Sequence, residues 1–158
     1  VALALRLHGI GQGLWYDEIL TYVDLAGLPF GEIATNYESQ NQHMLYTLLA
    51  HASFVVFGQG ALGLRLPAAL FGVGSVFVLY LLGTQVAGRR EAFLASALMA
   101  FSYHHVWFSQ NGRGYTGLLF WAILTTYLLL RALESGRAGL WVGYAAASAL
   151  GAYTHMTM

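Results

Sequence analysis

The sequence predicts an all-α integral membrane protein, a multi-span helical bundle with interfacial juxtamembrane helices in its first external loop. Hydrophobic residues fill 58% of the 158 positions and charged residues only 9%, whereas a soluble domain carries about 25% charged residues. The mean hydropathy is +0.58. Because so few charges cannot cover a surface that faces water, we expect lipid to be the solvent for most of the chain.

The charged and sulfur-containing residues exclude several classes of partner. The seven basic residues are all arginines, the seven acidic residues balance them, and cysteine is absent. We therefore expect no basic patch for nucleic acid, no disulfide framework and no cysteine-based metal site. The chain opens on the apolar run VALALRL, so we expect residues 1–10 to be the end of a first span within a longer protein.

Four apolar runs are long enough, or nearly so, to cross a bilayer, which takes about 20 residues. They cover approximately residues 66–87, 92–108, 114–133 and 139–156. The run at 43–57 would span only about 22 Å as a helix, short of the ~30 Å hydrocarbon core. It is expected to lie in the membrane interface.

The arginine-rich turns orient these spans. Residues 88–91 and 131–137 each contain two arginines in a short connection, which the positive-inside rule places in the cytoplasm. The span at 66–87 then starts outside, beside Arg65. With 43–57 in the interface, the whole stretch 11–65 is an external loop, and it contains five acidic residues: Asp17, Glu18, Asp24, Glu32 and Glu38.

An amphipathic helix is expected within this loop over residues 17–26. One face would be apolar and the other polar, and a glycine and a proline would end the helix. The apolar face is formed by Ile19, Tyr22, Val23 and Ala26, the polar face by Asp17, Thr21 and Asp24, and the terminating residues are Gly27 and Pro29.

The adjacent carboxylates Asp17 and Glu18 are the first candidates for chemistry. Their structural interpretation is an acidic first helical turn that complements the helix dipole. Their functional interpretation is a general base or a metal ligand at the mouth of a cavity. Position alone favours the structural one.

Two arginines, Arg65 and Arg113, lie on the external side at the membrane boundary. An arginine at that depth should be paired or bound to an anion, and its planar fork suits phosphate oxygens. A snorkelling side chain or a structural pair with an acidic loop residue is the alternative.

The histidines at the interface are expected to be packing residues more often than metal ligands. None shows the spacing of a metalloprotease motif. The adjacent pair within the polar-aromatic cluster at 103–110 is the best of them as a ligand. The set is His43, His51, His104, His105 and His155.

Several motifs in order resemble the C-type (GT-C) membrane glycosyltransferases. LWYDE resembles the acidic motif of their first external loop, and QNQHMLYTLLAHASFVVFG resembles the segment that follows it. GLRLPAALFG, YLLGTQVAGRR, SYHHVWFSQNGRGY and LLLRAL then match the branch that includes protein O-mannosyltransferases and lipid A aminoarabinose transferases. The resemblance covers nearly the whole chain and implies that residues 1–158 are a truncated N-terminal transmembrane catalytic domain.

The resemblance also implies roles for individual residues. Asp17 matches the base that deprotonates the acceptor, with Glu18 as its acidic neighbour. Arg65 matches an arginine that faces the carrier phosphate, and Arg113 is expected to contact the phosphate as well. The expected substrate-binding residues are His43, Gln110 and Tyr115.

Three departures from the family pattern bear on these expectations. Met44 stands where proline is usual, and Asn111-Gly112 replaces Glu-Ala. Gln42 stands where some relatives place an acidic residue that helps to bind zinc. A divalent cation is therefore compatible with the sequence but not required by it.

The resulting hypothesis is an inverting glycosyltransferase that uses a lipid-linked sugar, a polyprenyl-phosphate donor, at the extracytoplasmic face of the inner or plasma membrane. The acceptor, whether protein, glycan or lipid, is not specified by the sequence. The alternatives are a membrane transporter or lipid flippase, and a non-catalytic membrane subunit of the same fold. A transporter would carry charges at mid-membrane, and the middle of every apolar run here is uncharged.

Overall fold

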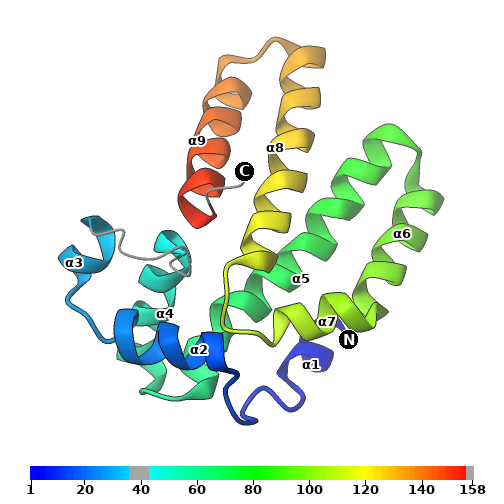
Figure 1. Ribbon diagram of the computed structural model, residues 1–158. Helices are drawn as coiled ribbons and strands as arrows, with labels where there is room; N and C mark the ends of the chain where they lie inside the picture. Colours follow the sequence, from blue (N-terminus) through cyan, green and yellow to red (C-terminus); the bar gives the residue numbers. More distant parts are fainter. Residues whose placement is uncertain (36–42, 156–158) are drawn as a thin grey trace.

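A computed structural model describes residues 1–35 and 43–155, and within these ranges the chain is helical without strands. The helices at the start of the chain are short, and those that follow are longer except for one of seven residues (Figure 1). In order they are α1 (Ala2–Leu7), α2 (Tyr16–Leu20), a π-helix (Thr21–Leu25), α3 (Phe30–Thr35), α4 (Met44–Phe57), α5 (Ala61–Val86), α6 (Arg89–Phe101), α7 (Tyr103–Ser109), α8 (Tyr115–Ser135) and α9 (Ala138–Thr154).

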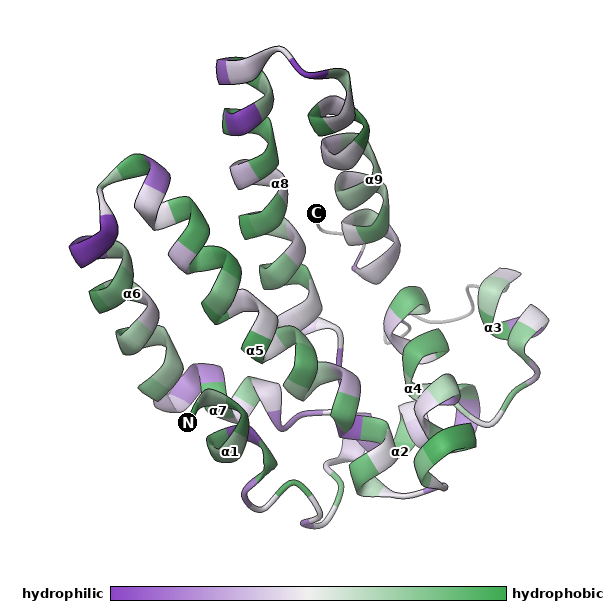
Figure 2. Cartoon of the chain, turned by 180° about the vertical axis from the view of Figure 1, so that it is seen from behind, coloured by the Kyte–Doolittle hydropathy of each residue, from purple (hydrophilic) through white to green (hydrophobic). Residues whose placement is uncertain are grey.

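The long helices run back and forth between two ends of the molecule. Helix α5 packs against α4, α6, α7 and α8, and α9 pairs with α8. The α5–α6 and α8–α9 turns lie at the same end, apart from each other, and α1, α2, α4 and α7 gather at the other end (Figure 1). The hydrophilic residues concentrate at these two ends, while the middles of α5 and α8 are hydrophobic (Figure 2).

Two helices, α5 with 26 residues and α8 with 21, are long and apolar enough to cross a membrane. In the most apolar stretch of each, only 33% and 22% of the residues are buried inside the protein. A core helix of a soluble protein would be mostly buried, so this exposure favours contact with lipid. Helix α4 is confirmed over the predicted run 43–57, and its 14 residues span about 21 Å.

The run predicted as a single span at 92–108 is divided into two helices. Helix α6 ends at Phe101, and Ser102 has extended backbone angles (φ −62°, ψ 121°). The Ser102 hydroxyl then accepts a hydrogen bond from the backbone N–H of His105 and caps α7. A serine favours such a helix start over a helix interior, so the polar cluster at 103–110 turns away from the direction of α6.

The helix predicted at 17–26 is present, but its second half is a π-helix. The backbone N–H of Ala26 bonds to the Thr21 carbonyl, one residue further back than in an α-helix. Glu18, Thr21 and Leu25 are buried, while Ile19 and Val23 are exposed. The predicted apolar face is therefore not the buried face as a whole.

Candidate functional site

The site is formed where α2, the start of α4, the start of α5 and the loop between α7 and α8 meet. This end of the molecule lies opposite the two arginine-rich turns (Figure 1). Asp17 and Glu18 are in the first turn of α2, Arg65 is in the first two turns of α5, and Arg113 is in the loop before α8. All four predicted charged residues thus meet here, in two layers.

The inner layer is a buried ion pair between Glu18 and Arg65. Arg65 Nε donates to Glu18 Oε1 at 2.7 Å and Arg65 Nη2 to Oε2 at 2.6 Å. Backbone N–H groups of Trp15 and Gly112 also donate to this carboxylate. Burial by itself would raise the pKa of Glu18, but these hydrogen bonds and the Arg65 charge lower it overall.

Arg65 uses all five of its N–H donors within the protein. Besides Glu18, it donates from Nη1 to the carbonyls of Ile10 and Gln12, both at 2.9 Å, and from Nη2 to the Gly13 carbonyl at 3.0 Å. A guanidinium has five N–H groups and no more. In this arrangement Arg65 ties the chain segment before α2 to α5, and no donor is left for a phosphate.

Gly112 is required by the close approach of the loop to Glu18. Its N–H reaches Glu18 Oε1, and a Cβ at this position would lie 2.8 Å from Leu64 Cδ2 and 3.0 Å from that oxygen. A residue with a side chain would push the loop away from the Glu18–Arg65 pair.

The outer layer pairs Asp17 with Arg113. Asp17 Oδ2 lies 3.0 Å from Arg113 Nη1, and the Asp17 side chain is 60% exposed while that of Arg113 is 7% exposed. Arg113 also donates from Nε to His43 Nε2 at 3.1 Å and from Nη2 to the Tyr115 hydroxyl at 3.3 Å. Arg113 therefore holds three of the predicted site residues around one cation.

His43 is a neutral packing and hydrogen-bonding residue at this site. Burial lowers the pKa of His43 to about 3, and the positive charge of Arg113 acts in the same direction. Its ring lies 4.6 Å from that of His155 and 5.6 Å from that of Tyr115, measured between ring centroids. A neutral ring lets Nε2 accept from the guanidinium.

A cavity of about 530 Å³ opens beside Asp17 and Arg113. Its size is typical of a small-molecule site. Aromatic and aliphatic side chains form most of the wall, with a few polar groups among them. The lining residues are Asp17, His105, Trp107, Phe108, Asn111, Arg113, Tyr115, Thr116, Leu118 and Leu119.

Gln110, predicted to bind substrate, lies beside a smaller neighbouring cavity and contacts the end of α1. Its side-chain amide donates to the carbonyls of Leu5, Arg6 and His8, at 3.1, 3.3 and 2.6 Å. These carbonyls have no partners inside so short a helix. Gln110 therefore caps α1 in this structure.

Metal ligation gains no support from the described part of the chain. Within residues 1–35 and 43–155, no three His, Asp or Glu side chains are grouped so that they could hold a metal ion. His104 is exposed and its ring packs edge-on against Tyr103. Glu38 and Gln42 lie outside the described residues.

Three further polar residues lie at the site: Arg6 and Asn111, which were not predicted as site residues, and His105, which was predicted only as part of the best histidine pair for a metal ligand. Arg6 is fully buried in α1 and its Nη2 lies 2.6 Å from His105 Nδ1. Asn111 is also buried and lines the cavity. An arginine inside the apolar opening run is the signal that could have indicated a buried partner.

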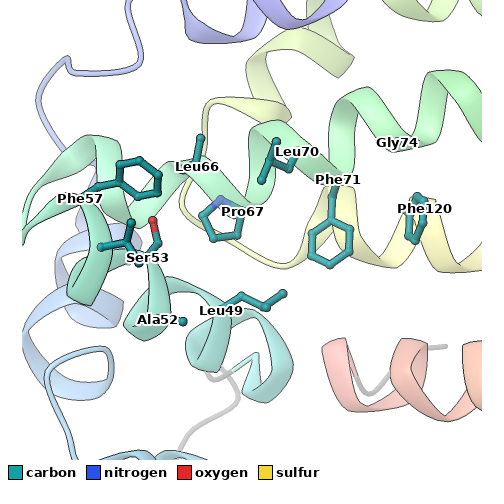
Figure 3. A pocket seen from close by; sticks show the side chains of 11 residues that line it. Leu49, Ala52, Ser53, Phe57, Leu66, Pro67, Leu70, Phe71, Gly74 and Phe120 are labelled. Atoms are coloured by element: carbon teal, nitrogen blue, oxygen red, sulfur yellow. The ribbon is translucent and has the colours of Figure 1, made fainter.

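A second cavity, of about 500 Å³, lies between α4, α5 and α8 (Figure 3). Leu49, Ala52, Ser53 and Phe57 of α4 face Pro67 and Leu70 of α5 across it, with Phe120 at one end. None of its lining residues can ionise. Of these two cavities, the one beside Asp17 has ionisable groups in its wall.

The fold and the site together define an apolar helical protein of the membrane type, with an acid–arginine pair at one end of its bundle. Residues 42–158 match the dolichyl-phosphate-mannose-protein mannosyltransferase family, so the chain belongs to this family of membrane glycosyltransferases. The match includes Arg65 and Arg113 and begins after Asp17 and Glu18.

One relative is a Bacillus subtilis (strain 168) protein named "Putative mannosyltransferase YkcB". It is 35% identical over 85 residues, which are 54% of this chain and 12% of that protein. The chain thus spans a small part of the length of this relative. No solved structure matches.

Proposed function

We propose that the protein transfers a sugar from a polyprenyl-phosphate carrier to an acceptor hydroxyl, with inversion at the anomeric carbon and with Asp17 as the base. The observation that carries the proposal is the pair of Asp17 and Arg113, 3.0 Å apart on the rim of the 530 Å³ cavity. A carboxylate and a guanidinium are the two groups that such a transfer needs, and the sugar of the donor would have to separate them, because the acceptor and the phosphate lie on opposite faces of the anomeric carbon.

The chemistry assigns one group to each half of the reaction. Asp17 takes the proton from the acceptor hydroxyl as its oxygen bonds to the anomeric carbon. The bond from that carbon to the phosphate oxygen breaks on the opposite face, and the polyprenyl phosphate leaves with the electron pair. Arg113 stabilises the negative charge on the departing phosphate.

The choice of Arg113 over Arg65 for the phosphate rests on their hydrogen bonds. Arg65 has both of its Nη groups occupied by carbonyls and by Glu18. Arg113 Nη1 is buried and faces Asp17 without a well-directed hydrogen bond, and Arg113 lines the cavity. A shift of Asp17 away from Arg113 would free that N–H to donate to a phosphate oxygen.

The extracytoplasmic location is part of the proposal. The site lies at the end of the bundle opposite the two arginine-rich turns (Figure 1). If those turns are cytoplasmic, as the positive-inside rule indicates, the cavity opens on the extracytoplasmic side. A lipid-linked donor fits this placement, because its tail remains in the bilayer while its phosphate lies at the interface.

Asp17→Asn tests the proposal because it keeps the shape of the side chain and removes the base. The expected result is loss of sugar transfer from radiolabelled mannosyl-phosphoryl-polyprenol, while binding of that donor persists. Asp24→Asn, an acidic residue of the same loop with an exposed side chain, is the matched control and should transfer normally. Near-normal transfer by Asp17→Asn would refute the base assignment.

The same assay separates the alternatives. A lipid flippase or transporter would move the carrier across vesicle membranes without cleaving the sugar from the phosphate. A non-catalytic subunit would bind the donor and neither move nor cleave it.

A further inference from the structure

Besides Arg113 Nη1, which faces Asp17, two residues that line the cavity each carry a buried polar atom without a hydrogen-bond partner in the described part of the chain. These atoms are His105 Nε2 and Asn111 Oδ1. His105 is 8% exposed and Asn111 9% exposed, and both line the cavity that Asp17 and Arg113 share. Because leaving a buried polar atom unpaired costs about 1–3 kcal/mol, two such atoms in one cavity point to a ligand.

The contact with Arg6 fixes which group His105 offers. Arg6 Nη2 lies 2.6 Å from His105 Nδ1, and a guanidinium can only donate. Nδ1 must therefore accept, so the ring proton is on Nε2, at the far side of the ring. The positive charge of Arg6 also draws electron density from the ring and makes Nε2–H a stronger donor.

The packing of three helices holds Arg6 and His105 in place. Arg6 Nη1 donates to the carbonyl of Ala2 at 2.8 Å, and the Ser109 hydroxyl donates to the His105 carbonyl at 2.6 Å. A Cβ at Gly72 of α5 would lie 2.1 Å from Ser109 Oγ and 3.0 Å from Arg6 Nε. Contacts among α1, α5 and α7 therefore fix the position of the Arg6–His105 pair.

We propose that His105 and Asn111 form the sugar-recognition site of the cavity, with His105 Nε2–H donating to a glycosyl hydroxyl and Asn111 Oδ1 accepting from one. A hydroxyl both donates and accepts, so it satisfies a donor and an acceptor together. A phosphate at neutral pH is mainly an acceptor, so Asn111 Oδ1, which is also an acceptor, would repel it. The aromatic rings of Trp107 and Phe108 complete a wall suited to a sugar face.

This inference rests on the proposed function and adds a residue pair that selects the sugar, distinct from the arginine that holds the phosphate. His105 is close to the transferred group, whereas Arg6 acts through His105 as a positioning residue. The sugar part and the phosphate part of the donor should therefore respond to different substitutions.

A matched pair of substitutions at His105 tests the assignment in the full-length protein. Asparagine places its amide near the position of Nδ1, so His105→Asn keeps a contact for Arg6 and removes the group that faces the sugar. Glutamine places its amide near Nε2, so His105→Gln keeps a donor for the sugar. We expect His105→Asn to raise the KM for mannosyl-phosphoryl-polyprenol about tenfold to hundredfold, and His105→Gln to keep most of the donor affinity.

The affinity for sugar-free polyprenyl phosphate is the internal control and should be the same in both variants. The opposite ranking, with His105→Asn near the wild type and His105→Gln impaired, would overturn the assignment, because His105 would then serve only to hold Arg6. Parallel weakening of donor and sugar-free carrier in both variants would overturn it as well, since it would indicate a general loss of structure.

Donors with single deoxy positions in the sugar give a second, independent readout. The wild type should discriminate against at least one deoxy donor, and His105→Asn should lose that discrimination. If His105→Asn discriminates as the wild type does, His105 does not touch the sugar. If the wild type neither binds nor transfers from any polyprenyl-linked sugar, the proposed function itself fails, which a loss confined to the variants does not imply.

Discussion

At the scale of single residues, the two arginines of the site differ in what surrounds them. Arg65 is buried with Glu18, which is fully buried, and every donor of Arg65 is used. Arg113 faces Asp17, whose side chain is 60% exposed and can be solvated by water if its partner is removed. Loss of Arg65 should therefore affect folding, and loss of Arg113 should affect the substrate.

The matched variants Arg65→Gln and Arg113→Gln separate these roles. Removal of one partner from a buried ion pair costs about 3–5 kcal/mol, because the other charge stays buried and unpaired. We expect Arg65→Gln to lower the melting temperature in detergent clearly. Arg113→Gln should lower it much less and should weaken the binding of sugar-free polyprenyl phosphate.

Both properties can be measured on the same purified samples, by thermal unfolding and by a binding titration. A stable Arg65→Gln protein that has lost carrier binding would contradict this division of roles and would assign phosphate binding to Arg65.

The sequence alone predicts Asp17, Glu18, Arg65 and Arg113 on one side of the membrane, and they do meet at one end of the bundle, but it could not pair them. Each arginine had two carboxylates within reach, and the pairing depends on the angle at which α2 meets α5. The amide of Gln110, which stays a predicted substrate-binding residue, caps α1. That contact joins positions more than a hundred residues apart, which no local pattern could indicate.

At the scale of elements, the loop between α7 and α8 completes the site by packing against α2 and α5. Gly112 brings its backbone N–H to the carboxylate of Glu18, and Leu64 of α5 fills the space where a side chain would be. The loop therefore has no room for an added methyl group. This tight contact couples the position of Arg113, one residue further on, to the inner ion pair.

Gly112→Ala should destabilise the protein by about 1–3 kcal/mol, the usual result of overpacking a filled site. It should also reduce sugar transfer, because the loop that carries Arg113 must move. Gly139→Ala is the matched control: it adds the same methyl group within α9, where a Cβ would meet nothing within 4 Å. A helical Gly→Ala change without a clash is neutral or stabilising.

Thermal unfolding and transfer assays on the two variants provide the comparison. Equal behaviour of Gly112→Ala and Gly139→Ala would show that the loop adjusts freely.

The elements themselves could be predicted in part from hydrophobic runs. Helices α4, α5, α8 and α9 occupy the predicted runs, with α5 beginning at Ala61 rather than near residue 66. The division of 92–108 at Ser102 could not be predicted from hydropathy, because its cause is a serine cap within an apolar-aromatic run. The π-helix at Thr21–Leu25 was missed because it shifts the period that an amphipathic pattern assumes.

At the scale of the whole molecule, the charges divide between two ends of an apolar bundle. The α5–α6 and α8–α9 turns carry four of the seven arginines at one end, and the Asp17–Arg113 and Glu18–Arg65 pairs lie at the other (Figures 1 and 2). Helix α5, about 39 Å long from its 26 residues, connects the two ends and exceeds the ~30 Å hydrocarbon thickness. The two charged ends can therefore lie in water on opposite sides of a bilayer.

Single cysteines at the two ends test this orientation, and the chain has no cysteine of its own. Gly60 precedes α5 at the site end, where a Cβ would meet nothing within 4 Å, and Ser135 is exposed at the end of α8. In intact cells, Gly60→Cys should react with a membrane-impermeant maleimide, whereas Ser135→Cys should react only after the membrane has been permeabilised. The reverse pattern would place the arginine turns outside and the cavity in the cytoplasm. Reaction of both from outside would mean that α5, α6 or α8 does not cross the bilayer, so that the separation of the charged ends is not a transmembrane arrangement.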